Sequence, residues 1–183
     1  MKTKRRKSQT SIGRIYFWTA TIHKWYNLLA EDEAKQLIVD YLKDLSHKQL
    51  ITVYGFVIMP NHIHLIWRLD KMNGKESPKA SFLKYTSHTL LKKLKISGDA
   101  WRYKVNASNK AHEIWQRDPL GIEIYSRNVA KQKLEYIHGN PCKGKWLLAK
   151  DDISYYYSSA RYYETGKDDF GFLNNLYILI DGY

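Results

Sequence analysis

The sequence predicts an α+β fold built on one antiparallel β-sheet. Three observations support this prediction. At 183 residues the chain is long enough for one domain with a sizeable core. Strand-like segments rich in β-branched and aromatic residues are separated by segments with helical periodicity. Residues 51–69 form two strand-like runs that meet at a tight Pro-Asn turn, which is typical of a hairpin.

The first elements are a strand and a helix. Residues 14–23, RIYFWTATIH, predict a strand because they are dense in aromatic and β-branched residues. Residues 31–45 predict the clearest helix, because apolar residues recur at i, i+3, i+4 and i+7. Glu31, Asp32 and Glu33 suit the positive N-terminal end of such a helix.

The second strand of the hairpin places two histidines on one face of the sheet, because successive side chains of a strand point to opposite faces. One face carries Ile63, Leu65, Trp67 and Leu69, and the other carries His62, His64, Ile66 and Arg68. At roughly 3.3 Å per residue, the Cα atoms of His62 and His64 lie about 7 Å apart. Both imidazoles can then reach one divalent ion at ~2.1 Å each. A His-apolar-His triplet is also compatible with two half-buried strand histidines that bind no metal.

The second half of the chain completes the sheet. Residues 77–94 predict a second helix, with a serine that can cap it and proline at its first position. Strand-like residues return from 113 (EIWQR), and after a Pro/Gly turn the segment IEIYSR adds a last strand. A third helix starts near Asn128, which can cap it, and ends around residues 139–141 because proline disfavours helical geometry in the residue before it. The order β-α-β-β-α-β plus a helix predicts a ferredoxin-like (split βαβ) antiparallel sheet with helices on one face.

The net charge of +12 is unevenly distributed along the chain. Residues 1–149 carry 27 basic and 12 acidic side chains, whereas residues 150–183 carry three and six. A basic body indicates a polyanionic partner, although a merely basic protein is the alternative. Fifteen tyrosines and six tryptophans add surfaces on which unpaired bases could stack.

The sequence lacks the features of secreted and membrane proteins. A single cysteine, Cys142, excludes a disulfide framework and a cysteine-rich zinc finger. No apolar run approaches the ~20 residues of a membrane span. The start MKTKRRKSQT lacks the apolar core of a signal peptide. We therefore expect a cytoplasmic protein without a membrane partner, in which residues 1–11 form a disordered basic arm.

The third helix carries polar residues at a regular spacing. Gln132, Tyr136 and Asn140 lie four residues apart, and so on one side if the helix persists to its end. Tyr136 then faces away from Leu134 and Ile137. A tyrosine on the polar face of a helix is usually amphipathic surface, but here the nearby sheet presents paired histidines.

Three ordered segments stand out: GFVIMPNHIHLIW; IWQRD followed by a strand, a helix and YIHGNP; and YSSARYY. Together they resemble the single-tyrosine HUH transposases, in particular the REP-associated tyrosine transposases. The resemblance covers residues 12–163. It implies an HUH catalytic domain over residues 12–149 that includes a catalytic tyrosine helix, with residues 150–183 as a C-terminal extension packing on that domain.

The chain departs from the family pattern at two places. The linker QRDPLGIEIYSR lacks the histidine or aspartate often found before the helix, and this leaves auxiliary acid–base groups open. His138 is a weak substitute for the missing group. Tyr157 stands where a tryptophan is common in the family.

The resemblance implies a metal site and a nucleophile. His62, His64 and Asn140 would hold Mg²⁺ or Mn²⁺, although zinc is also chemically plausible, and Tyr136 would attack a DNA phosphodiester. The product would be a 5′-phosphotyrosine and a free 3′-hydroxyl. Because the covalent link conserves the bond energy, rejoining would need no ATP. The side chains expected to contact DNA phosphates are Lys4, Arg5, Arg6, Lys7, Lys79, Lys92 and Lys93.

The partner implied by the resemblance is single-stranded DNA with hairpin ends. A homodimer is also a possible expectation, because related transposases are often dimers that place the tyrosine helix of one subunit beside the histidines of the other. An alternative of another class is a non-catalytic, single-stranded nucleic-acid-binding module on a ferredoxin-like fold, which reads bases by stacking. That alternative explains the charge and the aromatic residues but leaves the combination of His62, His64 and Tyr136 accidental.

Overall fold

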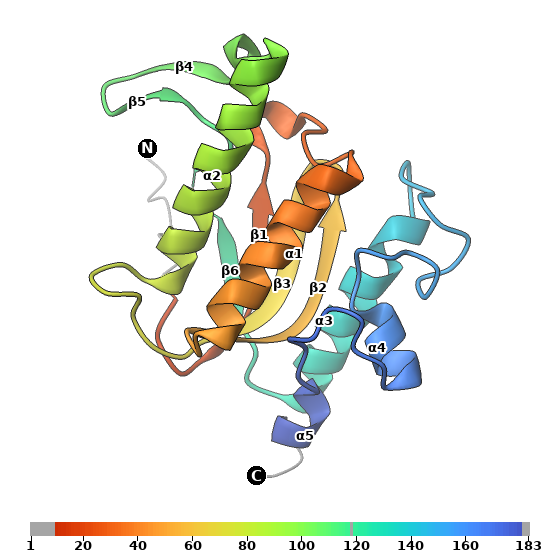
Figure 1. Ribbon diagram of the computed structural model, residues 1–183. Helices are drawn as coiled ribbons and strands as arrows, with labels where there is room; N and C mark the ends of the chain where they lie inside the picture. The colour runs from red at the N-terminus through yellow and green to blue at the C-terminus, as the bar shows by residue number, and fades with distance from the viewer. Residues whose placement is uncertain (1–9, 118, 181–183) are drawn as a thin grey trace, which may run out of the picture.

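A four-stranded antiparallel sheet forms the centre of the protein (Figure 1). The computed structural model describes residues 10–117 and 119–180. The strands lie in the order β2-β3-β1-β6 and are β1 (Ile15–Thr21), β2 (Ile51–Met59), β3 (His62–Leu69) and β6 (Leu120–Glu123). β3 lies between β1 and β2 and is antiparallel to both, as in a split βαβ unit. The predicted α+β fold with an antiparallel sheet is confirmed.

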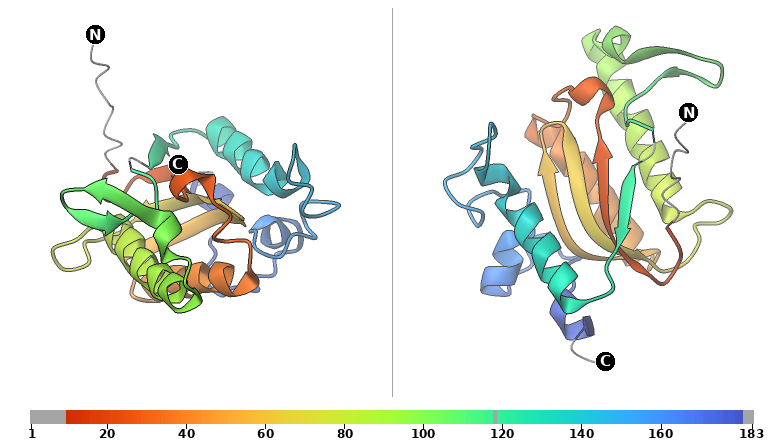
Figure 2. Two further views of the ribbon diagram at one scale, coloured as in Figure 1. Left: turned by 90° about the horizontal axis from the view of Figure 1, so that it is seen from above. Right: turned by 180° about the vertical axis from the view of Figure 1, so that it is seen from behind.

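Helices cover both faces of this sheet (Figure 2). α1 (Asp32–His47) and α2 (Pro78–Ser97) pack on one face, around a core that includes Trp18 and Trp67. α3 (Arg127–Gly139) packs on the other face, where a second apolar cluster lies between the helix and the sheet. The helices of the two predicted βαβ halves therefore share one face, and the predicted tyrosine helix occupies the other.

Serine residues set the starts of two helices, and one predicted cap is wrong. Ser77 Oγ accepts a hydrogen bond from the backbone N–H of Ala80 (3.2 Å) and caps α2, as the sequence predicts. α3 is capped by Ser126, whose Oγ accepts from the backbone N–H of Val129 (3.4 Å). Asn128 lies inside the first turn instead of at the cap. Ser126 is the residue with the extended backbone that a cap position needs.

The segment between α2 and α3 differs most from the prediction. The predicted strand from residue 113 is a single antiparallel bridge between Ile22 and Trp115. A hairpin of β4 (Lys104–Ala107) and β5 (Lys110–His112) precedes it. The sequence does not signal this hairpin, because its short strands are mostly polar and never fully buried, and so lack hydrophobic alternation.

Five short helices complete the fold of the described residues. They are η1 (His23–Trp25), η2 (Ala100–Tyr103), η3 (Asn140–Cys142), α4 (Ala160–Thr165) and α5 (Leu176–Ile180). Over residues 10–117 and 119–180, no helix is both long and apolar enough to cross a membrane.

The chain after α3 returns along the free edge of β2. The backbone N–H of Ser159 donates to the carbonyl of Phe56, and that of Asn174 donates to the carbonyl of Val53, both at 2.9 Å. An unpaired strand edge is a template for unwanted pairing with other chains. The C-terminal segment covers this edge, and among the described residues β6 forms the opposite edge of the sheet.

Candidate functional site

A pocket of about 470 Å³ opens on the α3 side of the sheet. It is lined by residues of β1, β3 and β6, of α3 and η1, and of the segment that follows α3. His62, His64, Tyr136 and Asn140 all line it. The four side chains that the sequence singles out for chemistry, on the hairpin and at the third helix, therefore meet at one place in one chain.

Strand alternation brings the two histidines to this face. Their neighbour Leu65 points the other way, into the core under α1 and α2. In the register of β1 and β3, Thr21 lies opposite His62 and Thr19 lies opposite His64. The two imidazole centroids are 4.8 Å apart, and both side chains are buried.

Hydrogen bonds fix which nitrogen each histidine presents to the pocket. Asn61 Nδ2 donates to the carbonyl of Trp25 (3.3 Å), which turns Asn61 Oδ1 toward His62. His62 Nδ1 therefore donates to Asn61 Oδ1 (2.7 Å) and leaves the lone pair on Nε2. His64 Nδ1 bonds Thr19 Oγ1 (2.7 Å), and His64 Nε2 is buried without a hydrogen-bond partner in the described part of the chain.

The surroundings keep both imidazoles neutral. Burial, reinforced by the positive charge of Lys145, lowers the pKa of His62 to about 4. Burial also lowers the pKa of His64 to about 3, with further contributions from His62 and Lys133. A neutral imidazole is the form that binds a metal ion, so both side chains are ready to act as ligands near neutral pH.

The pocket fits a divalent metal ion. A buried ring nitrogen without a hydrogen-bond partner is costly unless another group satisfies it, and His64 Nε2 is such an atom. Within the described residues no group of three or more His, Cys, Asp or Glu side chains could hold a metal. A third protein ligand must therefore be of another type, and the amide oxygen of Asn140 in the same pocket is available for that role.

Close packing of α3 on the sheet sets the position of Tyr136. A Cβ atom added to Gly55 in β2 would lie only 2.9 Å from Leu134 Cδ2 and 3.1 Å from Ile137 Cδ1. The glycine thus lets the apolar side of α3 approach β2 closely. Tyr136 on the adjoining side of the helix is 51% exposed, and its ring centroid is 5.3 Å from that of His64.

The predicted polar row of the third helix is present only in part. Tyr136 and Asn140 line the pocket, whereas Gln132 does not and Lys133 does. His138 points elsewhere: its Nε2 bonds Ser159 Oγ (2.8 Å) in the interior. Asn140 keeps a helical backbone after the last residue of α3, which is why it remains on the side of Tyr136.

Sequence reasoning missed several residues of this site, among them Thr19, Trp25, Asn61, Lys133 and Trp146. Asn61 adjoins His62 in the turn and could have been suspected as its hydrogen-bond partner. Thr19 is visible only once the pairing of β1 with β3 is known. Trp25 ends the three-residue helix η1 and Trp146 lies in an irregular segment, and neither segment is long enough in one period to show which way its side chain points.

The predicted DNA-contacting lysines of α2 lie away from this pocket. α2 packs on the opposite face of the sheet, and Lys93 Nζ pairs with Glu33 Oε1 (2.7 Å). Lys79 is partly buried and Lys92 is exposed, and neither lines the pocket. The remaining predicted contacts, on the N-terminal arm, fall within residues 1–9, outside the described residues. The lysines close enough to lower the pKa of a pocket histidine are Lys145, which acts on His62, and Lys133, which acts on His64.

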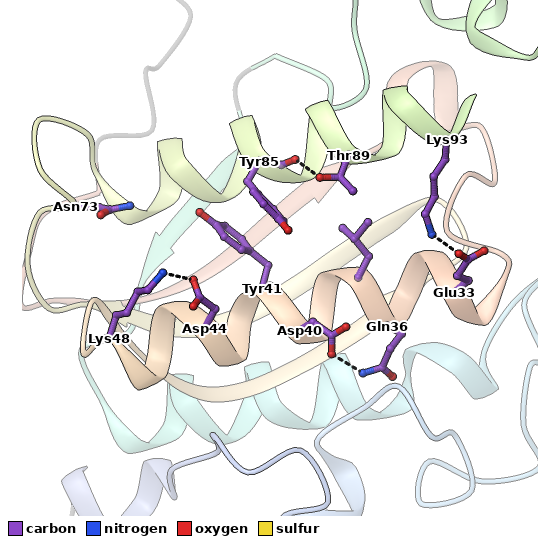
Figure 3. A pocket seen from close by; sticks show the side chains of 11 residues that line it. Glu33, Gln36, Asp40, Tyr41, Asp44, Lys48, Asn73, Tyr85, Thr89 and Lys93 are labelled. Atoms are coloured by element: carbon purple, nitrogen blue, oxygen red, sulfur yellow. Dashed lines mark hydrogen bonds and ion pairs between the residues drawn. The ribbon is translucent and has the colours of Figure 1, made fainter. Parts of the chain in front are cut away.

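A larger groove between α1 and α2 does not suit a polyanion (Figure 3). Its lining includes three acidic side chains, Glu33, Asp40 and Asp44. Its two lysines are engaged, since Lys93 pairs with Glu33 and Lys48 pairs with Asp44, both at 2.7 Å. The pocket on the α3 side is therefore the better candidate for nucleic-acid chemistry.

Comparisons with known proteins bear on the fold and on the resemblance. No protein-family model matches the chain. A protein of Haemophilus influenzae named "Putative REP-associated tyrosine transposase" is 26% identical over 150 residues, covering 78% of each chain. The solved structure of a REP-associated tyrosine transposase bound to a REP hairpin shares the fold, with a TM-score of 0.60 and 18% identity over 96% of this chain and 93% of that chain. The resemblance predicted from the sequence is thus confirmed.

Proposed function

We propose that this chain, which resembles the REP-associated tyrosine transposases, cuts and rejoins single-stranded DNA at hairpin-bearing ends. The solved relative is bound to a REP hairpin, which supports hairpin DNA as the class of substrate. The observation that carries the proposal is the meeting of Tyr136 with His64 in one pocket, at 5.3 Å between ring centroids.

His62 and His64 would hold Mg²⁺ or Mn²⁺ through the ring nitrogens that face the pocket, and Asn140 would bind it through its amide oxygen. Such an ion supplies Lewis acidity to the scissile phosphate and fixes its orientation. Asn61 Oδ1, which can only accept, keeps His62 in the tautomer that ligation needs, and Thr19 keeps the ring of His64 in place. Zinc is chemically compatible with the same ligands. The preference for Mg²⁺ or Mn²⁺ over zinc is therefore part of the proposal.

Tyr136 would act as the nucleophile. Its Oη forms a bond to phosphorus while the bond from phosphorus to the 3′-oxygen of the leaving strand breaks. The proton lost by the phenol is balanced by the proton that the departing 3′-oxygen gains. The result is a 5′-phosphotyrosine and a free 3′-hydroxyl, and attack by another 3′-hydroxyl reverses the step to join a new strand. Lys133, three residues before Tyr136, offers positive charge for the phosphate.

The test is formation of a denaturant-resistant protein–DNA adduct. Wild-type protein, Mg²⁺ or Mn²⁺ and a hairpin-bearing single strand should give the adduct, and chelation should prevent it. Tyr136→Phe should form no adduct, yet bind the same strand within a few-fold, because only one partly exposed oxygen is removed. Tyr125→Phe is the matched control, since Tyr125 is exposed and does not line the pocket.

The competing function is a binding module without chemistry. Normal binding without an adduct on every hairpin strand offered would favour that module. An adduct that persists in Tyr136→Phe would keep the enzyme but assign the nucleophile to another tyrosine.

A further inference from the structure

Trp25 presents a large indole ring at the edge of the histidine pocket. Its side chain is 58% exposed, it lines the pocket, and its ring centroid lies 6.2 Å from that of His62. Single exposed apolar residues are common on protein surfaces and need no explanation by themselves. The backbone that carries Trp25, however, is unusual.

Two consecutive residues of η1 adopt left-handed backbone angles. Lys24 has φ 52° and Trp25 has φ 59°, in a region that L-amino acids with side chains rarely adopt. The carbonyl of Trp25 accepts the hydrogen bond from Asn61 Nδ2, and the other end of that amide accepts from His62 Nδ1. One side chain therefore links the backbone of Trp25 to the orientation of a candidate metal ligand.

A second indole approaches the same histidine from a different segment. Trp146, in the segment that follows α3, has its ring centroid 6.1 Å from that of His62. Lys145 Nζ lies 5.0 Å from the Trp146 ring centroid. On the His64 side, Phe17 stacks on the imidazole at 5.2 Å and has Lys133 Nζ 5.0 Å from its centroid.

Aromatic rings and lysine side chains thus lie together around the histidine pair. Single-stranded nucleic acids are held by this combination, because bases stack on aromatic rings while lysines and arginines neutralise the phosphates between them. Stacking is tolerant of sequence, since every base has a flat face. It does require that the base be unpaired and turned out toward the protein.

We propose that Trp25 and Trp146 bind, by stacking, the unpaired bases next to the phosphate that is cut, and that Lys133 and Lys145 contact the backbone beside them. This rests on the proposed function for the identity of the partner as single-stranded DNA. The site accepts only a strand whose bases are free at the point of cleavage. The indoles, and not contacts to particular base edges, confer that selectivity for single strands.

The test compares two strands that differ only in their bases. One is a short homothymidine strand, and the other has the same length and backbone with an abasic site at every position. Wild-type protein should bind the homothymidine strand more tightly, since each base stacked on an aromatic ring adds about 5- to 140-fold in affinity. Trp25→Ala should reduce this preference by about 5-fold or more, with little change for the abasic strand.

Matched variants separate stacking from simple packing. Trp25→Phe should keep most of the preference, because it retains an aromatic face, whereas Trp25→Leu, which is apolar but not aromatic, should lose as much as Trp25→Ala. Trp101→Ala is the control, because Trp101 is 73% exposed but does not line the pocket. Unchanged circular dichroism and melting temperature would show that the variants are folded.

An unchanged preference in both Trp25→Ala and Trp25→Leu would overturn the proposal, and so would equal losses for both strands. Adduct formation with a hairpin-bearing strand, measured in parallel, separates this result from a failure of the proposed function. Loss of base preference without any adduct in the wild type would leave the stacking site standing and remove the cleavage reaction. An adduct together with an unchanged base preference would support the cleavage reaction and remove the stacking site.

Discussion

Two short hydrogen bonds determine which nitrogen each histidine of the pocket presents. Asn61 holds His62 by its Nδ1, and Thr19 holds His64 in the same way. Ligand histidines are normally oriented by such partners, and loss of a partner typically weakens metal affinity ~10–100-fold. The period of two along β3 predicts that both histidines share a face. It cannot reveal Thr19, because strand pairing across 45 residues decides that contact.

Thr19→Val should therefore weaken metal binding with little change of shape. Valine keeps the volume of threonine but cannot bond His64 Nδ1, so the imidazole loses the hydrogen bond that orients its ring. We expect Mn²⁺ affinity, measured by calorimetric titration, to fall by about 10-fold or more. Thr52→Val is the control, because Thr52 bonds Asp70 outside the pocket. Equal Mn²⁺ affinities for Thr19→Val and wild type would contradict this role of Thr19.

His138 should make folding depend on pH. Burial lowers its pKa to about 4 in the folded chain, against the ordinary 6.5 that the unfolded chain retains. The unfolded state therefore binds more protons between these values, so the stabilisation is complete above pH 6.5 and is lost as the pH falls toward 4. His138→Gln should make the fall in unfolding free energy shallower by up to ~1.4 kcal/mol per pH unit in this window. Urea unfolding with chelator at several pH values measures it, and an unchanged slope would refute it.

At the scale of elements, the distance between α3 and β2 sets the position of Tyr136, the proposed nucleophile. Sequence patterns predict α1, the hairpin and α2 well, because each has a clear period and a turn or cap signal. They do not predict how closely α3 approaches the sheet. That distance depends on Gly55, which looks in the sequence like an interruption of a strand and is in fact a point of contact with Leu134.

Gly55→Ala should lower the adduct yield strongly while lowering the free energy of unfolding only moderately. The added methyl group would crowd Leu134 and Ile137, cost about 1–3 kcal/mol of unfolding free energy and shift α3 with Tyr136. Adding Leu134→Ala removes the closest of these atoms, so the double variant should recover cleavage relative to Gly55→Ala alone. Urea unfolding and adduct yield measure the two effects. Full adduct yield from Gly55→Ala would show that α3 does not set the position of Tyr136.

On the scale of the whole molecule, one chain contains every candidate group of the site. His62 and His64 on β3, and Tyr136 and Asn140 at the end of α3, line the same pocket. The element order in the sequence predicts the sheet and its antiparallel pairing. It does not predict that the tyrosine helix lies against the histidines of its own chain, because the connection from β6 through residues 124–126 carries no signal of its direction.

A complete site in one chain predicts that defective subunits will not complement each other. Tyr136→Phe and His64→Ala proteins, mixed at equal concentrations, should give no more adduct than either alone, because no site in the mixture has both groups. Covalent adduct on a hairpin-bearing strand is again the measure. Restored cleavage would indicate that the tyrosine helix is exchanged between subunits.

The most direct measurement is the identity of the residue that becomes attached to DNA. Wild-type protein would be incubated with Mn²⁺ and a hairpin-bearing single strand, denatured, and digested with nuclease and protease. Mass spectrometry of the peptides should then find the 5′-phosphonucleotide on Tyr136, within the sequence KLEYIHGNP, and none in the presence of chelator. A nucleotide mapped to any other residue, or no modified peptide from a strand that the protein demonstrably cuts, would contradict the account.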